Sequence, residues 1–110
     1  MVPDNSSMDF ELLTIQDCPH GSAARELFSR AVELEGSDPA LIAVRKIMTD
    51  QEAEASGFHG SPSFMVDGID LFPSAAEPSV SCRVYRTARG LAGLPSLESL
   101  REAIQARLAA

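Results

Sequence analysis

The chain has 110 residues, 45% of them apolar, which suits one domain built around one hydrophobic core. Its formal net charge is −7 and its sequence pI is about 4.6. A surface this acidic repels the phosphates of nucleic acids and of anionic membranes, so we expect neither as a partner. No segment approaches the ~20 apolar residues that a membrane-spanning helix needs.

Residues 1–8 are polar and are expected to form a flexible tail before a folded domain that spans residues 9–110. The tail lacks the basic region and apolar stretch of a signal peptide. The sequence therefore predicts a cytoplasmic protein whose thiols are kept reduced.

The first half of the domain has the pattern strand, helix, strand. The apolar run 10–15 has the length of a buried strand, and from residue 19 the apolar residues recur with the period of a helix. The apolar face of this helix consists of Ala24, Leu27, Phe28, Ala31 and Val32. Gly36 is expected to end the helix, and residues 41–47 predict a second strand. A helix that joins two strands in this way makes them parallel, with a right-handed crossover.

The middle of the domain has the pattern helix, hairpin. Thr49 and Glu52 have the spacing of a capping box, which predicts a short helix that Gly57 ends. Residues 63–72 contain Asp67-Gly68 between two apolar arms, which is the strongest short signal for a β-hairpin.

The last part of the chain is predicted to be an irregular loop followed by a helix. The loop covers residues 73–95 and is rich in proline and glycine; loops of this length are often functional. Ser96 is expected to cap the helix. Its apolar stripe consists of Leu97, Leu100, Ile104 and Leu108. The element order β-α-β-α-β-β-α predicts an α/β fold with a central mixed four-stranded sheet and helices on both faces.

Cys18 is the residue with the clearest chemical potential. If Pro19 is the first helical residue, Cys18 is the N-cap, and its sulfur faces the free N–H groups of His20 and Gly21 at the positive end of the helix dipole. These surroundings, and a protonated His20, favour the thiolate, which attacks disulfides and binds soft metals. Alternatively, Ser22 caps the helix and leaves Cys18 in a loop, or Cys18 is a small buried apolar residue.

The histidines have simpler alternatives. His20 is equally compatible with an ordinary exposed loop residue, and we expect no role for His59 in its Phe-His-Gly turn. Together with the two cysteines, these histidines lack the spacing of a structural zinc site, so we expect no bound cofactor.

Cys18-Pro19-His20 at a helix start, a βαβ unit and Ser61-Pro62 before a hairpin together resemble the thioredoxin superfamily, over residues 9–109. The resemblance implies a cis Ser61–Pro62 bond that faces the reactive cysteine and helps to bind substrate. Cys-Pro-His is also similar to the motif of the bacterial periplasmic disulfide-introducing oxidases. Gly21 occupies the position of the second, resolving cysteine, so the usual route for releasing a mixed disulfide is missing.

A closer resemblance is to small thioredoxin-like proteins, some of which are labelled alkylmercury lyase. It rests on Cys18-Pro19, Gly60-Ser61-Pro62, Asp67-Gly68 and Cys82-Arg83-Val84-Tyr85. Authentic organomercurial lyases use two cysteines and an aspartate, a donor set that suits a soft metal. Cys18, Cys82 and Asp17, or less well Asp67, would take those roles here.

Cys82 is the candidate resolving residue, although it is equally compatible with a loop cysteine that has no role. Arg83 is a candidate for binding a thiolate or an anion, with a local surface ion pair as the alternative. Tyr85 and Phe72 could wall the site or simply pack in the core.

Three hypotheses follow. In the first, Cys18 attacks a thiol or disulfide substrate, either a small molecule or a protein, and Cys82 or an external thiol such as glutathione resolves the mixed disulfide. In the second, Cys18 and Cys82 handle organomercury or a soft metal. In the third, the chain is a non-catalytic binding module that has kept the fold without the chemistry.

Overall fold

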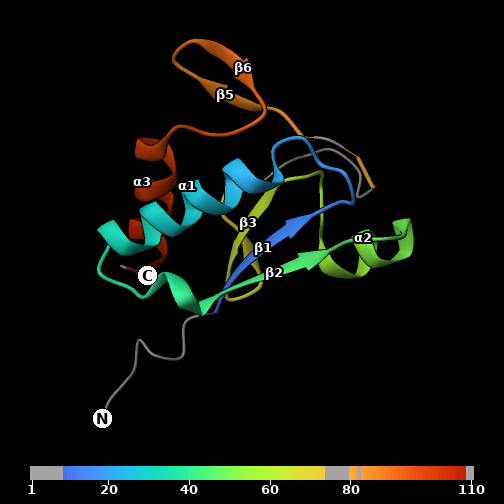
Figure 1. Cartoon of the computed structure of the whole chain (residues 1–110), viewed down its shortest axis with the longest axis horizontal. Helices are drawn as coiled ribbons and strands as arrows, with labels where there is room; N and C mark the ends of the chain where they lie inside the picture. Colours follow the sequence, from blue (N-terminus) through green and yellow to red (C-terminus); the bar gives the residue numbers. More distant parts are fainter. Residues whose placement is uncertain (1–8, 74–79, 82, 109–110) are drawn as a thin grey trace.

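A four-stranded mixed sheet forms the centre of the molecule (Figure 1). The computed structural model describes residues 9–73, 80–81 and 83–108. The sheet has the order β2-β1-β3-β4, with strands β1 (Phe10–Thr14), β2 (Ile42–Lys46), β3 (Ser63–Val66) and β4 (Ile69–Asp70). β1 and β2 are parallel, whereas β3 is antiparallel to both β1 and β4. The predicted α/β class and the mixed four-stranded sheet are confirmed.

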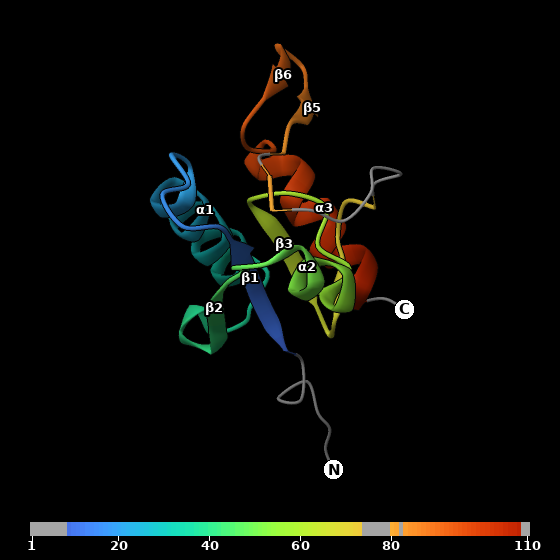
Figure 2. The ribbon, with the colours of Figure 1, turned by 90° about the vertical axis from the view of Figure 1, so that its right-hand side faces the viewer.

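Helices cover both faces of the sheet. They are α1 (Gly21–Leu34), α2 (Asp50–Ser56) and α3 (Leu97–Leu108). α1 and α3 lie side by side, and α2 lies on the opposite side of β1 from α1 (Figures 1 and 2). Side chains along a strand alternate between the two faces. Leu12 and Phe64 accordingly pack in the main core with α1 and α3, whereas Leu13 and Met65 pack in a smaller cluster with α2.

Helix α1 begins at Gly21, two residues later than a helix that starts at Pro19. The prediction that Cys18 caps this helix is therefore wrong, and so is the alternative with Ser22 as the cap. The N-cap is His20, whose side chain makes no capping hydrogen bond. The reason is a turn before the helix, in which the Gly21 N–H donates to the Cys18 carbonyl over 3.1 Å.

Gly36 follows the last turn of α1 with a φ of 88°, as predicted for the end of the helix. A short 3₁₀-helix, η2 (Pro39–Leu41), then leads into β2. The second strand therefore begins at Ile42, one residue later than expected.

The two strongest local signals are confirmed. The Thr49 hydroxyl accepts a hydrogen bond from the Glu52 N–H (3.1 Å), while the Glu52 carboxylate accepts one from the Thr49 N–H (3.2 Å). Gly57 ends α2 in the left-handed conformation. Asp67 and Gly68 have φ values of 53° and 79°, so both turn positions are left-handed, as this type of hairpin requires.

A second, two-stranded sheet lies where the sequence predicts an irregular loop, so that prediction is wrong over residues 85–92. Strands β5 (Tyr85–Thr87) and β6 (Gly90–Ala92) form a ribbon that projects from the body (Figures 1 and 2). In its turn, the Thr87 hydroxyl accepts from the Arg89 N–H (3.2 Å) and donates to the Gly90 carbonyl (2.7 Å). The ribbon escapes sequence analysis because its strands are short and its turn lacks Asn-Gly or Asp-Gly.

Helix α3 begins as predicted, because the Ser96 hydroxyl accepts a hydrogen bond from the Ser99 N–H over 3.0 Å. Leu100 and Ile104, from its apolar stripe, are fully buried against α1 and the sheet. Within the described part of the chain, no helix has both the length and the apolar character to cross a membrane.

Candidate active site

Cys18 lies in the tight connection between β1 and α1. Its N–H donates to the Ile15 carbonyl over 3.3 Å, and Asp17 within this turn has a φ of 60°. Aspartate tolerates this left-handed conformation better than most residues. Asp17 and Pro19 on either side are exposed, whereas Cys18 is a half-buried free thiol. The turn thus holds the sulfur at the margin of the core.

Ser61 is a hydrogen-bond partner of this sulfur. The Ser61 hydroxyl donates a hydrogen bond to Cys18 Sγ over 2.9 Å, and the Ser61–Pro62 peptide bond is cis, as the thioredoxin resemblance implies. Ser61 and Pro62 are both buried. The structure therefore brings together three of the predicted site residues.

The direction of the Ser61 hydroxyl is set by a third group. The Ile15 N–H donates to Ser61 Oγ over 3.2 Å. Because the oxygen accepts this bond, its own proton is free for the sulfur. A hydroxyl that donates to sulfur binds the thiolate more strongly than the thiol, since hydrogen bonds to charged acceptors are stronger.

Gly21 lies directly beside Cys18. A Cβ atom placed on Gly21 would lie 3.9 Å from the Cys18 Cβ, which is an ordinary contact. The φ of Gly21 is outside the left-handed region, so neither space nor backbone conformation requires glycine here. A side chain at position 21 would therefore lie in contact with Cys18.

The His20 ring is covered by the segment that follows β6. A Cβ atom on Gly93 would lie only 2.3 Å from His20 Nε2, so glycine at this position makes room for the imidazole. His20 is consequently half-buried instead of fully exposed.

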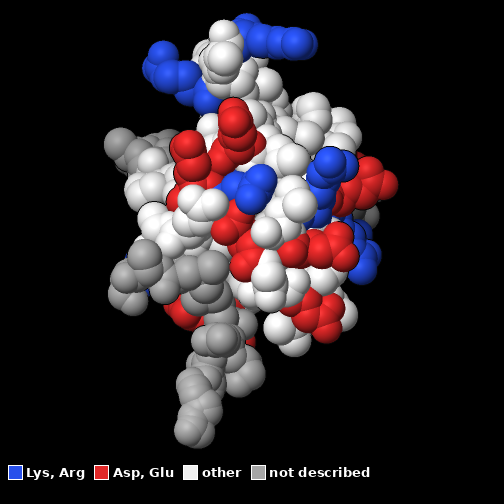
Figure 3. All heavy atoms as spheres, turned by 90° about the vertical axis from the view of Figure 1, so that its left-hand side faces the viewer, with Lys and Arg blue, Asp and Glu red and all other residues white. Residues whose placement is uncertain are grey.

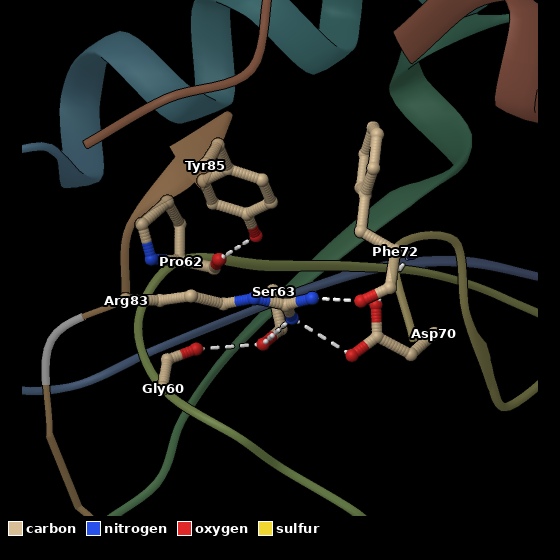
Figure 4. Close-up of polar contacts among 7 residues, drawn as sticks. All are labelled: Gly60, Pro62, Ser63, Asp70, Phe72, Arg83 and Tyr85. Carbon is tan, nitrogen blue, oxygen red and sulfur yellow. Dashed lines mark hydrogen bonds and ion pairs between the residues drawn. The ribbon is translucent and has the colours of Figure 1, made fainter. Parts of the chain in front are cut away.

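Arg83 is the centre of a buried polar network (Figure 4). Its guanidinium forms an ion pair with Asp70 (2.8 Å), donates to the Ser63 hydroxyl (3.2 Å) and donates to the Phe72 carbonyl. The Arg83 and Asp70 side chains are only 7% and 11% exposed. The guanidinium predicted to bind a thiolate or an anion is thus engaged by Asp70, and the pair is buried instead of lying on the surface.

Tyr85 connects this network to the residues beside the sulfur. Its ring lies under the Arg83 guanidinium, 4.8 Å from ring centroid to Cζ, and its hydroxyl donates to the Pro62 carbonyl. Burial raises the pKa of the Tyr85 phenol, an effect that nearby Arg83 opposes. Tyr85 and Phe72 pack edge to face with centroids 5.2 Å apart, so they wall the network.

The backbone of Ser61 is held from the other side by the segment that enters the ribbon. The Ser61 N–H donates to the Ser81 carbonyl (2.8 Å), and the Arg83 N–H donates to the Ser61 carbonyl (2.9 Å). Cys82, the predicted resolving residue, lies outside the described residues.

Sequence reasoning missed Asp70 and Ser63. A signal for Asp70 existed, because a carboxylate in an otherwise apolar hairpin arm needs a buried partner. Nothing in the sequence distinguished Arg83 as that partner from the other arginines.

Among the described residues, no group of three or more His, Cys, Asp or Glu side chains could hold a metal ion. Comparison with protein-family models, with curated proteins and with solved structures finds no match for this chain. Any functional conclusion therefore rests on the residues themselves.

Proposed function

We propose that the chain has a thioredoxin-like fold and acts as a thiol–disulfide oxidoreductase with Cys18 as its single nucleophile. The strand order β2-β1-β3-β4, with helices on both faces, supports the fold. The observation that carries the function is the 2.9 Å hydrogen bond from the Ser61 hydroxyl to Cys18 Sγ. It supplies, at a half-buried sulfur, the donor that a thiolate nucleophile needs.

The first chemical step follows from this geometry. The Cys18 thiolate attacks one sulfur of a substrate disulfide, so that a new S–S bond forms as the substrate bond breaks. The other substrate sulfur leaves with the electron pair and takes a proton from solvent. Ser61 holds the attacking sulfur as an anion and releases it when the sulfur becomes neutral.

The mixed disulfide must then be released by a second thiol, because Gly21 cannot supply one. Cys82 is one candidate, and the hydrogen bonds of its chain neighbours Ser81 and Arg83 to Ser61 support it. An external thiol such as glutathione, present in a reducing compartment such as the cytoplasm, is the other. Cys82 would attack the Cys18 sulfur, so that a Cys18–Cys82 disulfide forms and the substrate leaves as a thiolate that takes a proton from solvent; two glutathione thiols would then reduce that disulfide and leave as oxidised glutathione. Without Cys82, one glutathione would attack the Cys18 sulfur and expel the substrate thiolate, and a second would free Cys18 and leave as oxidised glutathione.

The test is reduction of a small model disulfide by the wild-type chain in the presence of glutathione. Cys18→Ser should lower the rate to that of glutathione alone, which reduces the disulfide slowly by direct exchange. Cys82→Ser separates the two resolving routes, because it slows turnover only if Cys82 resolves the intermediate. Reduction by Cys18→Ser above the rate of glutathione alone would refute the proposal, as would a wild-type Cys18 that alkylates no faster than a free cysteine peptide at neutral pH. The latter result would favour a non-catalytic binding module.

A further inference from the structure

The β5–β6 ribbon presents one open face to solvent. Arg86 and Leu91 lie opposite each other in the strand register, and Val84 shares their face because it precedes Arg86 by two residues. Val84 is 64% and Leu91 68% exposed, the highest values among the large hydrophobic side chains that the structure describes. Tyr85, on the other face, is buried. The ribbon therefore packs on the body through one face only.

The ribbon is basic on an otherwise acidic molecule, with Arg86 on its open face and Arg89 in its turn. Residues 78–97 contain no Asp or Glu, while the whole chain carries a net charge of −7. Arg86 and Arg89 are exposed, and neither is paired with a carboxylate within the described ranges. Figure 3 shows basic side chains at the end of the molecule where the ribbon projects, above acidic ones on the body.

Both ends of the ribbon are anchored beside Cys18. At its entry, the Arg83 N–H donates to the carbonyl of Ser61, whose hydroxyl binds the sulfur. At its exit, Gly93 lies against the ring of His20, two residues beyond Cys18. A polypeptide that brings a disulfide to Cys18 therefore meets the ribbon next to it.

We propose that the open face of the ribbon docks an acidic polypeptide substrate of Cys18. Carboxylates of the substrate pair with Arg86 and Arg89, and an apolar substrate side chain covers Val84 and Leu91. Charge complementarity argues for an acidic partner, and the spread of these side chains along the ribbon, from Val84 before β5 through the turn to Leu91 in β6, argues for a polypeptide over a small thiol. This inference rests on the proposed function, since it names the class of substrate for the same sulfur.

The experiment uses two synthetic peptides, each with one leucine and one cysteine blocked as a 2-thiopyridyl disulfide. One peptide carries four glutamates, and its twin carries four lysines. All of these measurements use a Cys82→Ser background, so that the released thiopyridone measures the rate at which Cys18 attacks. At low ionic strength we expect the acidic peptide to react roughly tenfold faster than its twin, and high salt should reduce this ratio.

The variants assign that preference to the ribbon. Arg86→Glu/Arg89→Glu should abolish or invert the ratio, and Val84→Ser/Leu91→Ser should slow both peptides. The control Arg30→Glu/Lys46→Glu changes the net charge equally at exposed residues elsewhere and should keep the ratio. A ratio that survives in Arg86→Glu/Arg89→Glu, or that the control loses equally, overturns the inference.

Two further measurements separate this inference from the proposed function. A small neutral disulfide reports the reactivity of Cys18 alone, so its failure to react refutes the proposed function. Fluorescence anisotropy tests the docking face independently of the chemistry. It measures binding of the same peptides, with serine in place of their cysteine, to the Cys18→Ser protein. Absence of charge-selective binding in that measurement overturns the inference. Analytical ultracentrifugation tests the alternative that the face binds a second copy of the chain. A concentration-dependent dimer that Val84→Ser/Leu91→Ser abolishes would therefore also overturn the inference.

Discussion

The hydroxyl of Ser61 and the sulfur of Cys18 lie 2.9 Å apart although 43 positions separate them in the chain. The Ile15 N–H fixes the direction of that hydroxyl from behind. The polar contact at this sulfur therefore comes from tertiary structure and not from a helix N-terminus, because α1 starts only at Gly21 and its N-cap is His20 instead of Cys18.

Ser61→Ala should slow the alkylation of Cys18 at neutral pH roughly tenfold, because a hydrogen bond to a charged group contributes about 1.5 kcal/mol or more. The measurement is the rate with iodoacetamide as a function of pH.

The exposed serine of the first turn of α1 provides a control for this substitution. Ser22→Ala should leave the whole pH profile unchanged. Profiles of Ser61→Ala and wild type that coincide at neutral pH would show that the hydroxyl has only a structural role.

Gly21→Cys should create a pair of cysteines that can form a disulfide. A Cβ at position 21 would lie 3.9 Å from that of Cys18, within the range of about 3.5–4.5 Å found in disulfides. Mild oxidation should close a disulfide between Cys18 and the introduced cysteine, visible in peptide mapping by mass spectrometry, in a background with Cys82→Ser.

Gly21→Ala is the matched control for the added side chain, and it should change the free energy of unfolding by less than about 1 kcal/mol, because the Cβ meets no clash. A Gly21→Cys chain that folds as well as Gly21→Ala but stays a dithiol under oxidation would contradict the geometry.

These relationships mark what sequence could and could not predict. The Thr49–Glu52 capping box and the Asp67-Gly68 turn were predictable because each depends on a few neighbouring residues. The start of α1 was not, because the segment before it is held by contacts from distant parts of the chain, namely Ser61 to Ile15 and Cys18 and Gly93 to His20.

The contact between Ser61 and Cys18 was predicted only through the resemblance to thioredoxin-like proteins, since no local rule joins positions so far apart. The Arg83–Asp70 pair was unpredictable for the same reason. A buried partner is chosen by the fold, and the ribbon that positions Arg83 has strands too short to leave a periodic signal.

Breaking the Arg83–Asp70 pair should destabilise the fold strongly. Arg83→Met leaves the buried Asp70 carboxylate without its partner, which costs about 3–5 kcal/mol in the free energy of unfolding. Arg83→Met/Asp70→Leu should recover much of that loss, because it removes both charges. Urea unfolding measures the free energy of unfolding of the single and the double variant.

The exposed Arg45–Glu11 pair serves for comparison, since its atoms lie 3.9 Å apart and its side chains are 46% and 32% exposed. Arg45→Met should cost less than about 1 kcal/mol. An equal cost for Arg83→Met and Arg45→Met would mean that the Arg83 network does not hold the ribbon to the site.

Tyr85 should make the protein less stable at alkaline pH. Burial raises the pKa of its phenol in the folded state, whereas the unfolded chain ionises near pH 10. Above pH 10 the unfolded state binds fewer protons than the folded state, so the free energy of unfolding falls as the pH rises. The stabilisation that Tyr85 contributes is therefore fully present only below about pH 10. Tyr85 is the chain's one tyrosine and there is no tryptophan, so ultraviolet absorbance reports its ionisation directly.

We expect the phenolate signal to appear only as the chain unfolds, together with the loss of helical circular dichroism. Tyr85→Phe should weaken the alkaline decline, although the unpaired Pro62 carbonyl costs it about 1–3 kcal/mol at neutral pH. A phenol that titrates near pH 10 in a chain that stays folded would show that Tyr85 is open to solvent. In that case it could not connect the Arg83 network to the residues that hold Cys18.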